Sequence, residues 1–191
     1  MKRFSKRVVL ASASPRRREI LTDMGIEFEI LPSDIDESRI SAASPRLLTK
    51  RLAVAKAAAV DVSGATVIGA DTIVVLGGKV YGKPHTKDNA VSMLGELCGR
   101  WHTVFTGVCV MCDGKKICFS VRSQVKLKAL STDEIVRYVE DASPLDKAGA
   151  YGIQDGRVVE KYKGSYTNIV GLPKEKLASV LARVGVTNGN C

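Results

Sequence analysis

The stretch VVLASASPRRR, residues 8–18, decides how the chain begins to fold. Its first four residues, 8–11, are small or apolar and predict a short buried strand. Ser14 is a favoured residue at a helix N-cap, and Pro15 suits the first helical position because an N–H has no helical partner there. We therefore expect a strand followed at once by a helix that ends near Gly25, which is the opening of an α/β fold.

Three arginines, Arg16 to Arg18, stand in the first turn of this expected helix. That turn has unpaired N–H groups and the positive end of the helix dipole, so cations are unfavourable there unless an anion offsets them. Serine hydroxyls, backbone N–H groups and guanidinium groups together indicate a phosphate site, although the sequence has neither a P-loop nor a dinucleotide-binding glycine motif. The alternative is a solvated basic helix start without a ligand.

The composition is that of a single domain spanning residues 1–191. The 191 residues are 45% hydrophobic, which is enough for one buried core and short for two. No apolar run reaches about 18 residues and no secretory segment follows the basic start, so we expect a cytoplasmic protein that contacts no membrane. The net charge of +9 favours polyanionic ligands. With 5% aromatic residues and no RNA-binding aromatic motif, the sequence argues against nucleic acid as the partner.

Strand and helix patterns alternate along the rest of the chain, without repeats or low-complexity linkers. Turn residues and caps predict strands over 27–31, 65–76, 79–81, 103–112 and 117–127, and helices over 45–59, 86–98, 131–139 and 174–184. Because hairpins occur beside strand–helix units, we expect a mixed β-sheet with flanking helices.

Three of the five cysteines lie in the 103–112 and 117–127 strands, which a two-residue Asp-Gly loop joins as a hairpin. Such a loop places Cys109 opposite Cys118. The C-x-x-C motif that ends at Cys112 does not predict a zinc site. Residues 109 and 112 of a strand point to opposite faces, and the sequence has no second pair of ligands to complete such a site. We expect small buried thiols rather than a structural disulfide, with a redox response as the alternative.

A second chemical signal is Asp71, in the GADT of residues 69–72 within an apolar strand. A buried carboxylate costs several kcal/mol unless a cation, a metal or strong hydrogen bonds compensate it, so we expect a partner. Candidates are Lys56 on an alanine-rich helix, Lys83 after a hairpin, and a metal ion shared with Glu37, because two carboxylates can hold one Mg²⁺ or Mn²⁺. Each residue alone has a simpler interpretation as a solvated or turn residue.

Small and polar residues alternate in DKAGAYGIQ, residues 146–154. Close approach of the backbone to a ligand would explain Gly149 and Gly152, and the amide of Gln154 can recognise a base. A tight crossing of two chain segments is the alternative. The turn-rich segment 164–173 either supports the same site or leads into the last helix.

Taken together, these motifs resemble those of the Maf nucleotide pyrophosphatases. The matching motifs occur in order from residue 8 to 173: SASPRR at 12–17, LA with KA at 52–57, GADT at 69–72, GKP at 82–84, HTVFTG at 102–107, DKAGAYGIQ at 146–154, and GSY with GLP at 164–173. Seven ordered motifs are far more specific than any one of them. The resemblance implies an elongated mixed sheet with two lobes around a central cleft, similar to the inosine-triphosphate pyrophosphatase fold, and a homodimer.

The chemistry that the resemblance implies is hydrolysis of a nucleoside triphosphate between its α and β phosphates, with Mg²⁺ or Mn²⁺ as cofactor. Asp71 matches the family's catalytic base, with its role as a metal ligand equally workable, and Glu37 matches a metal partner. Four cations would offset triphosphate charge and a serine would bind a phosphate oxygen. These substrate-binding residues are Arg16, Arg17, Lys56, Lys83 and Ser12.

The family divides by base preference. Arg16, Thr72 and Gln154 resemble the branch that acts on dTTP, UTP and 5-substituted pyrimidine triphosphates, in nucleotide-pool cleaning. The alternatives are 7-methyl-GTP as substrate, or a non-catalytic regulator of septum formation that binds nucleotide or nucleic acid. His102 matches a family histidine that orients a loop, although a lone histidine beside an apolar strand is more often structural.

Overall fold

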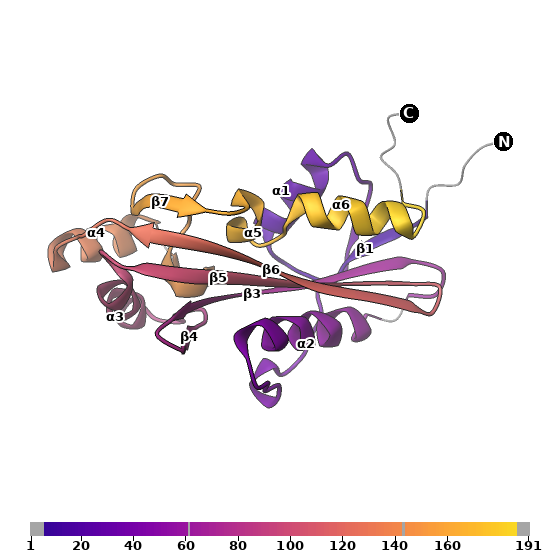
Figure 1. Cartoon of the computed structure of the whole chain (residues 1–191), viewed down its shortest axis with the longest axis horizontal. Helices are drawn as coiled ribbons and strands as arrows, with labels where there is room; N and C mark the ends of the chain where they lie inside the picture. Colours follow the sequence, from indigo (N-terminus) through magenta and orange to yellow (C-terminus); the bar gives the residue numbers. More distant parts are fainter. Residues whose placement is uncertain (1–5, 61, 143, 187–191) are drawn as a thin grey trace. The chain divides into compact units, whose positions relative to one another are not determined.

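The structure is a computed structural model that describes residues 6–60, 62–142 and 144–186. Its strands form a seven-stranded sheet in the order β2-β1-β3-β5-β6-β7, with β4 paired to β3. Pairing is parallel where β1 meets β2 and β3, and antiparallel where β3 meets β4 and β6 meets β7. The predicted α/β fold with a mixed sheet is therefore confirmed (Figure 1). The strands are β1 (Val8–Leu10), β2 (Glu29–Ile30), β3 (Thr66–Leu76), β4 (Lys79–Tyr81), β5 (Trp101–Cys112), β6 (Lys115–Leu127) and β7 (Val159–Lys163).

The helices begin and end close to the predicted positions because their caps are local. Ser44 Oγ accepts the N–H of Leu47, and Thr86 Oγ1 accepts the N–H of Asn89. The α-helices are α1 (Pro15–Asp23), α2 (Pro45–Ala58), α3 (Lys87–Leu97), α4 (Thr132–Ala142), α5 (Tyr166–Val170) and α6 (Lys174–Arg183). Three short 3-10 helices are η1 (Glu37–Arg39), η2 (Pro144–Asp146) and η3 (Ala148–Ala150).

The chain divides into two compact units. The first contains Met1–Asp71, Thr106–Val121 and Gly171–Cys191, and the second contains Thr72–Phe105 and Arg122–Val170. The expectation of one domain with a cleft between two lobes stays a prediction.

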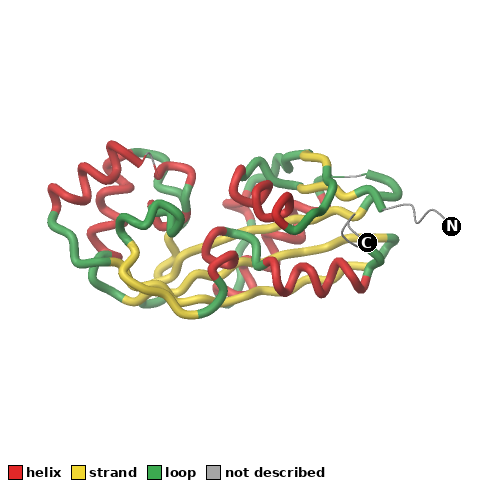
Figure 2. Tube along the Cα trace, turned by 90° about the horizontal axis from the view of Figure 1, so that it is seen from above, coloured by secondary structure: helices red, strands yellow, loops and turns green. Residues whose placement is uncertain are grey.

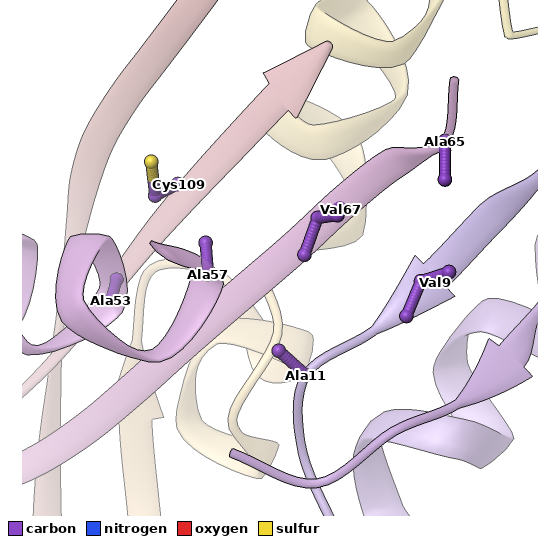
Figure 3. Packing of buried hydrophobic residues seen from close by; sticks show 7 residues of the cluster. All are labelled: Val9, Ala11, Ala53, Ala57, Ala65, Val67 and Cys109. Carbon is purple, nitrogen blue, oxygen red and sulfur yellow. The ribbon is translucent and has the colours of Figure 1, made fainter. Parts of the chain in front are cut away.

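In the first unit, helices lie on both faces of the strands. Figure 1 shows α2 on one side and α1 with α6 on the other. Alternation along β1 and β3 explains this arrangement, because successive residues of a strand point to opposite faces. Val9 and Val67 face α2 in a cluster with Ala53 and Ala57 (Figure 3), while Leu10 is buried on the next position of β1.

In the second unit, the helices gather beside the strands. Helix α3 packs against α4, η2 and η3, which are drawn in red at the left of Figure 2. Three of the buried side chains that α3 and α4 contribute are Leu94, Leu97 and Tyr138.

The glycine-rich and turn-rich region of residues 146–173, for which the sequence predicts no helix or strand, contains η3, β7 and α5. Strand β7 pairs antiparallel with β6, with Val125 opposite Tyr162. Four of its five residues are exposed, and charged residues dominate it, so its own sequence carries no apolar alternation. Its strand conformation depends on pairing with β6, a partner distant in sequence.

Candidate functional site

Helix α2 packs on the face of β3 that contains Asp71, the acidic residue of the site. Val67, Gly69 and Asp71 alternate along β3, and Ala65 directly before the strand continues the alternation, so this row of residues shares the face that α2 covers. A Cβ on Gly69 would collide with the carbonyl oxygen of Ala53, and glycine therefore lets the helix approach the strand closely. Figure 3 shows Ala53 and two members of the row, Ala65 and Val67.

Lys56 lies on α2 within this close contact, and its ammonium group reaches two carboxylates. The Nζ atom is 2.6 Å from Asp71 Oδ1 and 2.8 Å from Glu37 Oε1. The side chains of Lys56 and Asp71 are only 12% and 9% exposed, whereas that of Glu37 is 53% exposed. The partner expected for Asp71 is therefore a cation, Lys56, with Glu37 as a second acceptor at the solvent side.

Arg17 is buried, which overturns the interpretation of the whole helix start as a solvated basic patch. Its Nε donates to the carbonyl of Gly171 at 2.9 Å, and another guanidinium nitrogen donates to Ser12 Oγ at 2.9 Å. Burial lowers the pKa of Arg17, while the negative charges of Asp71 and Glu37 act in the opposite direction. Arg17 thus belongs electrostatically to the same cluster as the two carboxylates.

The capping role expected of Ser14 is only half right. Ser14 holds the N-cap position of α1, but its side chain makes no capping hydrogen bond. Its backbone N–H instead donates to Ser12 Oγ at 3.3 Å. Ser12 therefore accepts from both Arg17 and the start of α1, and this places its hydroxyl beside the first helical turn. Arg16, in that turn, is half-buried.

The carboxylates suit a hard divalent cation, although they are few. Glu37 and Asp71 both contact Lys56 Nζ and so lie close together, and carboxylate oxygens are the ligands that Mg²⁺ and Mn²⁺ prefer. Mg²⁺ is commonly held by one or two carboxylates, with water and substrate phosphates as the other ligands. Within residues 6–60, 62–142 and 144–186, no group of three His, Cys, Asp or Glu side chains is placed to hold a metal. The donor set therefore fits a cation that arrives with its substrate.

Three predicted site residues belong to the second unit. Thr72 lies in β3 and is half-buried, Lys83 follows β4 and is exposed, and Gln154 follows η3 and is exposed. The structure thus brings together five of the predicted residues, which lie with Arg16 in the first unit, and the parts played by all nine predicted site residues stay predictions. The five are Ser12, Arg17, Glu37, Lys56 and Asp71.

A tight crossing of chain segments accounts for the glycines of residues 146–154. Gly149 has a φ of 72°, and a Cβ there would lie 3.0 Å from the Val74 side chain. Its N–H donates to the carbonyl of Gly82 at 3.0 Å. Gly152 donates its N–H to Tyr138 Oη at 3.2 Å. For Gly149, the structure therefore supports the interpretation as a tight crossing of two chain segments.

His102 has the structural environment that its neighbourhood indicated. It is 3% exposed, and its Nε2 lies 2.8 Å from Tyr151 Oη. Burial lowers the pKa of His102 from 6.5 to about 4, so the ring is neutral at physiological pH.

Sequence patterns missed Asn168, which is fully buried in the turn-rich segment. Its Nδ2 donates to Ser123 Oγ at 2.9 Å and to the Val104 carbonyl at 3.3 Å. The amide thus fixes α5 to β5 and β6. The glycine and serine that precede it are the signal for a turn but do not indicate which strands the turn meets.

The protein is thus an α/β protein whose first unit holds a charged cluster near the start of α1. The cluster consists of the carboxylates of Glu37 and Asp71, the lysine Lys56 and the buried arginine Arg17. The chain belongs to the Maf-like protein family, whose sequence model matches residues 7–184. None of the described helices is both long and apolar enough to cross a bilayer.

Three relatives illustrate how much of the chain is shared, and each is named dTTP/UTP pyrophosphatase. The protein from Thermosipho africanus is 46% identical over 92% of this chain and 92% of its own length. The protein from Aquifex aeolicus is 42% identical over 96% and 98%, and that from Desulforamulus reducens is 44% identical over 94% and 97%.

Among solved structures, a HAM1 protein from Coxiella burnetii aligns over 93% of this chain and 99% of that chain. The TM-score is 0.48 and the identity is 16%, a likeness too weak to add to the family assignment.

Proposed function

We propose that this protein is a nucleoside triphosphate pyrophosphatase that hydrolyses dTTP and UTP. The reaction cleaves the bond between the α and β phosphates and releases the nucleoside monophosphate and pyrophosphate. The observation that carries the proposal is 42–46% identity, over more than nine-tenths of each chain, to three relatives named for this activity. The cluster around Asp71 supplies the groups that such a reaction needs.

In the proposed mechanism, Asp71 accepts a proton from the attacking water or helps to hold the cation. The ammonium group of Lys56, 2.6 Å from Asp71 Oδ1, fixes the direction of this carboxylate. Lys56 also offsets negative charge that develops on the phosphates in the transition state. Both proposed roles of Asp71 require a carboxylate oxygen that faces the attacking water or the cation.

Arg17 and Ser12 prepare the phosphate site at the start of α1. Two contacts, to Gly171 and Ser12, hold the guanidinium in one orientation, so little side-chain entropy is lost when an anion binds. We assign Arg16 and Lys83 to the remaining phosphate charge, and Thr72 and Gln154 to recognition of the pyrimidine.

Glu37 and Asp71 would hold the divalent cation, Mg²⁺ or Mn²⁺. When bound, the cation neutralises phosphate charge and lowers the pKa of a coordinated water. We expect EDTA to stop pyrophosphate release and added Mg²⁺ or Mn²⁺ to restore it.

The test is pyrophosphate release by the purified chain from dTTP, UTP, 5-methyl-UTP, CTP, GTP and 7-methyl-GTP with Mg²⁺ or Mn²⁺. We expect the three thymine and uracil nucleotides to be the best substrates. Release chiefly from 7-methyl-GTP would contradict the assignment of the pyrimidine pocket. No release from any nucleotide would contradict the enzymatic function and favour a regulator that binds without catalysis.

Two further expectations from the family resemblance belong to this proposal. We propose that the protein acts as a homodimer in the cytoplasm. Light scattering behind a sizing column would give the mass of two chains, and the mass of a single chain would contradict the dimer.

A further inference from the structure

The two strands of the β5–β6 hairpin bring two cysteines face to face. Cys118 Sγ lies 2.9 Å from Cys109 Sγ, and both are free thiols. The connecting turn has positive φ at both Asp113 and Gly114, 49° and 72°, as a two-residue hairpin loop requires. That loop sets Cys109 directly opposite Cys118, in agreement with the contact between their sulfur atoms.

A second pair of residues supports the same register. Two residues further from the turn, Gly107 stands opposite Ser120, and both meet Thr49 of α2. A Cβ on Gly107 would collide with the Thr49 backbone, and Ser120 Oγ is 3.2 Å from Thr49 Oγ1. Because strand residues alternate between faces, the two cysteines also point toward α2.

The backbone at this pair suits a disulfide. Counting from the turn, the positions of Cys109 and Cys118 form a non-hydrogen-bonded pair, in which Cα atoms are about 4.5 Å apart. Disulfides accept Cα separations of about 4.4 to 6.8 Å. A bond between the two sulfurs therefore needs a side-chain adjustment and no change of register.

The two thiols differ in access, and this difference gives them separate chemical roles. Cys109 is fully buried against Ala53 and Ala57, and burial raises its pKa. Cys118 is half-buried, so an oxidant in solution meets it first. Cys112 is 4% exposed, and its sulfur accepts a hydrogen bond from Thr66 Oγ1 at 3.2 Å. This hydrogen bond joins it to β3 and not to the Cys109–Cys118 pair.

We propose that Cys109 and Cys118 form a reversible oxidation site that takes a peroxide as its oxidant. Cys118, as the thiolate, attacks hydrogen peroxide; the O–O bond breaks, and the products are a sulfenic acid on Cys118 and hydroxide. The Cys109 sulfur then attacks the Cys118 sulfur, the S–O bond breaks, and water leaves as the disulfide forms. Two thiols lose two electrons in total, and one peroxide is reduced to two waters.

The bridge would protect Cys118 from further oxidation. A sulfenic acid without a nearby thiol is converted by more peroxide to sulfinic acid, which ordinary thiols do not reduce. Cys109 is already in contact with Cys118 and so competes with a second peroxide molecule. This site is independent of the proposed nucleotide hydrolysis, and its test needs no substrate.

The experiment treats the full chain with hydrogen peroxide, blocks remaining thiols with iodoacetamide, and maps tryptic peptides by mass spectrometry. Cleavage at lysine and arginine separates residues 101–115, with Cys109 and Cys112, from residues 117–122, with Cys118. We expect the two peptides to be linked, with a loss of about 2 Da that dithiothreitol reverses.

Variants identify the pair. Cys112→Ser is the matched control and should keep the link, whereas Cys109→Ser and Cys118→Ser should each abolish it. In Cys109→Ser, the same peroxide dose should instead add about 32 Da to Cys118 as sulfinic acid. Far-UV circular dichroism checks the fold, and Cys118→Ser, at a half-buried position, provides a second variant if Cys109→Ser does not fold.

Two results would overturn the proposal. One is a native chain in which Cys118 becomes sulfinic acid without any link to residues 101–115. The other is a link that survives Cys109→Ser, since it would then involve Cys112.

Discussion

Lys56 offsets the negative charge of the candidate site, because its ammonium group contacts the carboxylates of both Glu37 and Asp71. Its side chain and that of Asp71 are nearly buried, so solvent screens their attraction little. Removing one partner of such a pair leaves an uncompensated charge, which costs roughly 3 to 5 kcal/mol in fully buried cases. Glu37 is exposed, and its contact with Lys56 contributes less.

Replacing Lys56 with methionine leaves an unbranched side chain that is one atom shorter and removes the charge. We expect kcat/KM for dTTP to fall by about 100-fold or more, because charge on the phosphates is no longer offset in the transition state. Lys50→Met, on the same helix, is the matched control and should stay within about 2-fold of the native value. Equal losses in the two variants would mean that Lys56 acts only through the stability of α2.

His102 provides a pH-dependent contribution to stability. The folded chain holds its pKa at about 4, against 6.5 ordinarily, so between these values the unfolded chain binds the proton more readily. The free energy of unfolding should therefore fall as pH drops from about 6.5 to about 4, by up to about 3 kcal/mol from this residue. Urea unfolding of the native chain and His102→Gln across that range measures the contribution.

In His102→Gln, the free energy of unfolding should depend less steeply on pH, by the equivalent of about one bound proton. Glutamine can form a hydrogen bond with the Tyr151 hydroxyl, but it does not titrate in this range. An unchanged slope would contradict the burial of a neutral His102.

At the residue level, the sequence predicted that Asp71 needs a partner, because an acidic side chain in an apolar strand is costly. The structure identifies that partner as Lys56, and the contact with Glu37 adds a second carboxylate that no local pattern joins to α2. The burial of Arg17 could not be predicted from local sequence either, since its guanidinium donates to the carbonyl of Gly171, far along the chain.

Among the elements, α2 and β3 position the site through their close packing. Gly69 allows this contact, because a Cβ would lie 2.7 Å from the backbone nitrogen of Ala57 and would also clash with the Ala53 carbonyl. Backbone atoms of a packed helix cannot move aside without shifting the whole helix. The position of Lys56 therefore depends on a residue that has no side chain.

Gly69→Ala should destabilise the chain by about 1 to 3 kcal/mol, the usual cost of overpacking a core, and lower activity with it. Gly95→Ala is the matched control: it lies in α3, where a Cβ meets nothing within 4 Å, and helix propensity should make it neutral or slightly stabilising. Urea unfolding compares the two variants. A Gly69→Ala protein as stable as the native chain would contradict the packing described.

Elements whose ends are fixed by local chemistry could be predicted from sequence. The capping box at Ser131 and Glu134 is an example, with Ser131 N–H donating to the Glu134 carboxylate at 2.7 Å. The Asp-Gly hairpin is another. Strand β7 could not be predicted, because its exposed residues become a strand only by pairing with β6.

For the whole molecule, the sequence predicted a mixed α/β sheet but not its strand order. Adjacent pairs such as β3–β4 follow from a tight turn, whereas β1–β3 pairing joins segments between which α1, β2, η1 and α2 lie in the sequence. The same limit applies to the site: its residue types are visible in the motifs, while their meeting in the first unit depends on the fold.

The net charge of +9 leads to a prediction about substrate capture. A basic protein attracts a triphosphate through long-range electrostatics, which salt screens over about 10 Å at 0.1 M. Raising NaCl from about 50 to about 300 mM should increase KM for dTTP several-fold, with a smaller change in kcat. Steady-state kinetics measures both values, and a salt-independent KM would contradict electrostatic capture.

We propose that Asp71 and its partners hydrolyse the α–β bond of dTTP. The most direct test measures dTMP and pyrophosphate from dTTP with the native chain, Asp71→Asn and the exposed-acid control Asp23→Asn, after all three are shown to fold. We predict equimolar dTMP and pyrophosphate from the native and control proteins, and a loss of at least about 100-fold in Asp71→Asn. Undiminished hydrolysis by a folded Asp71→Asn protein, or dTDP and phosphate as products, would contradict the account.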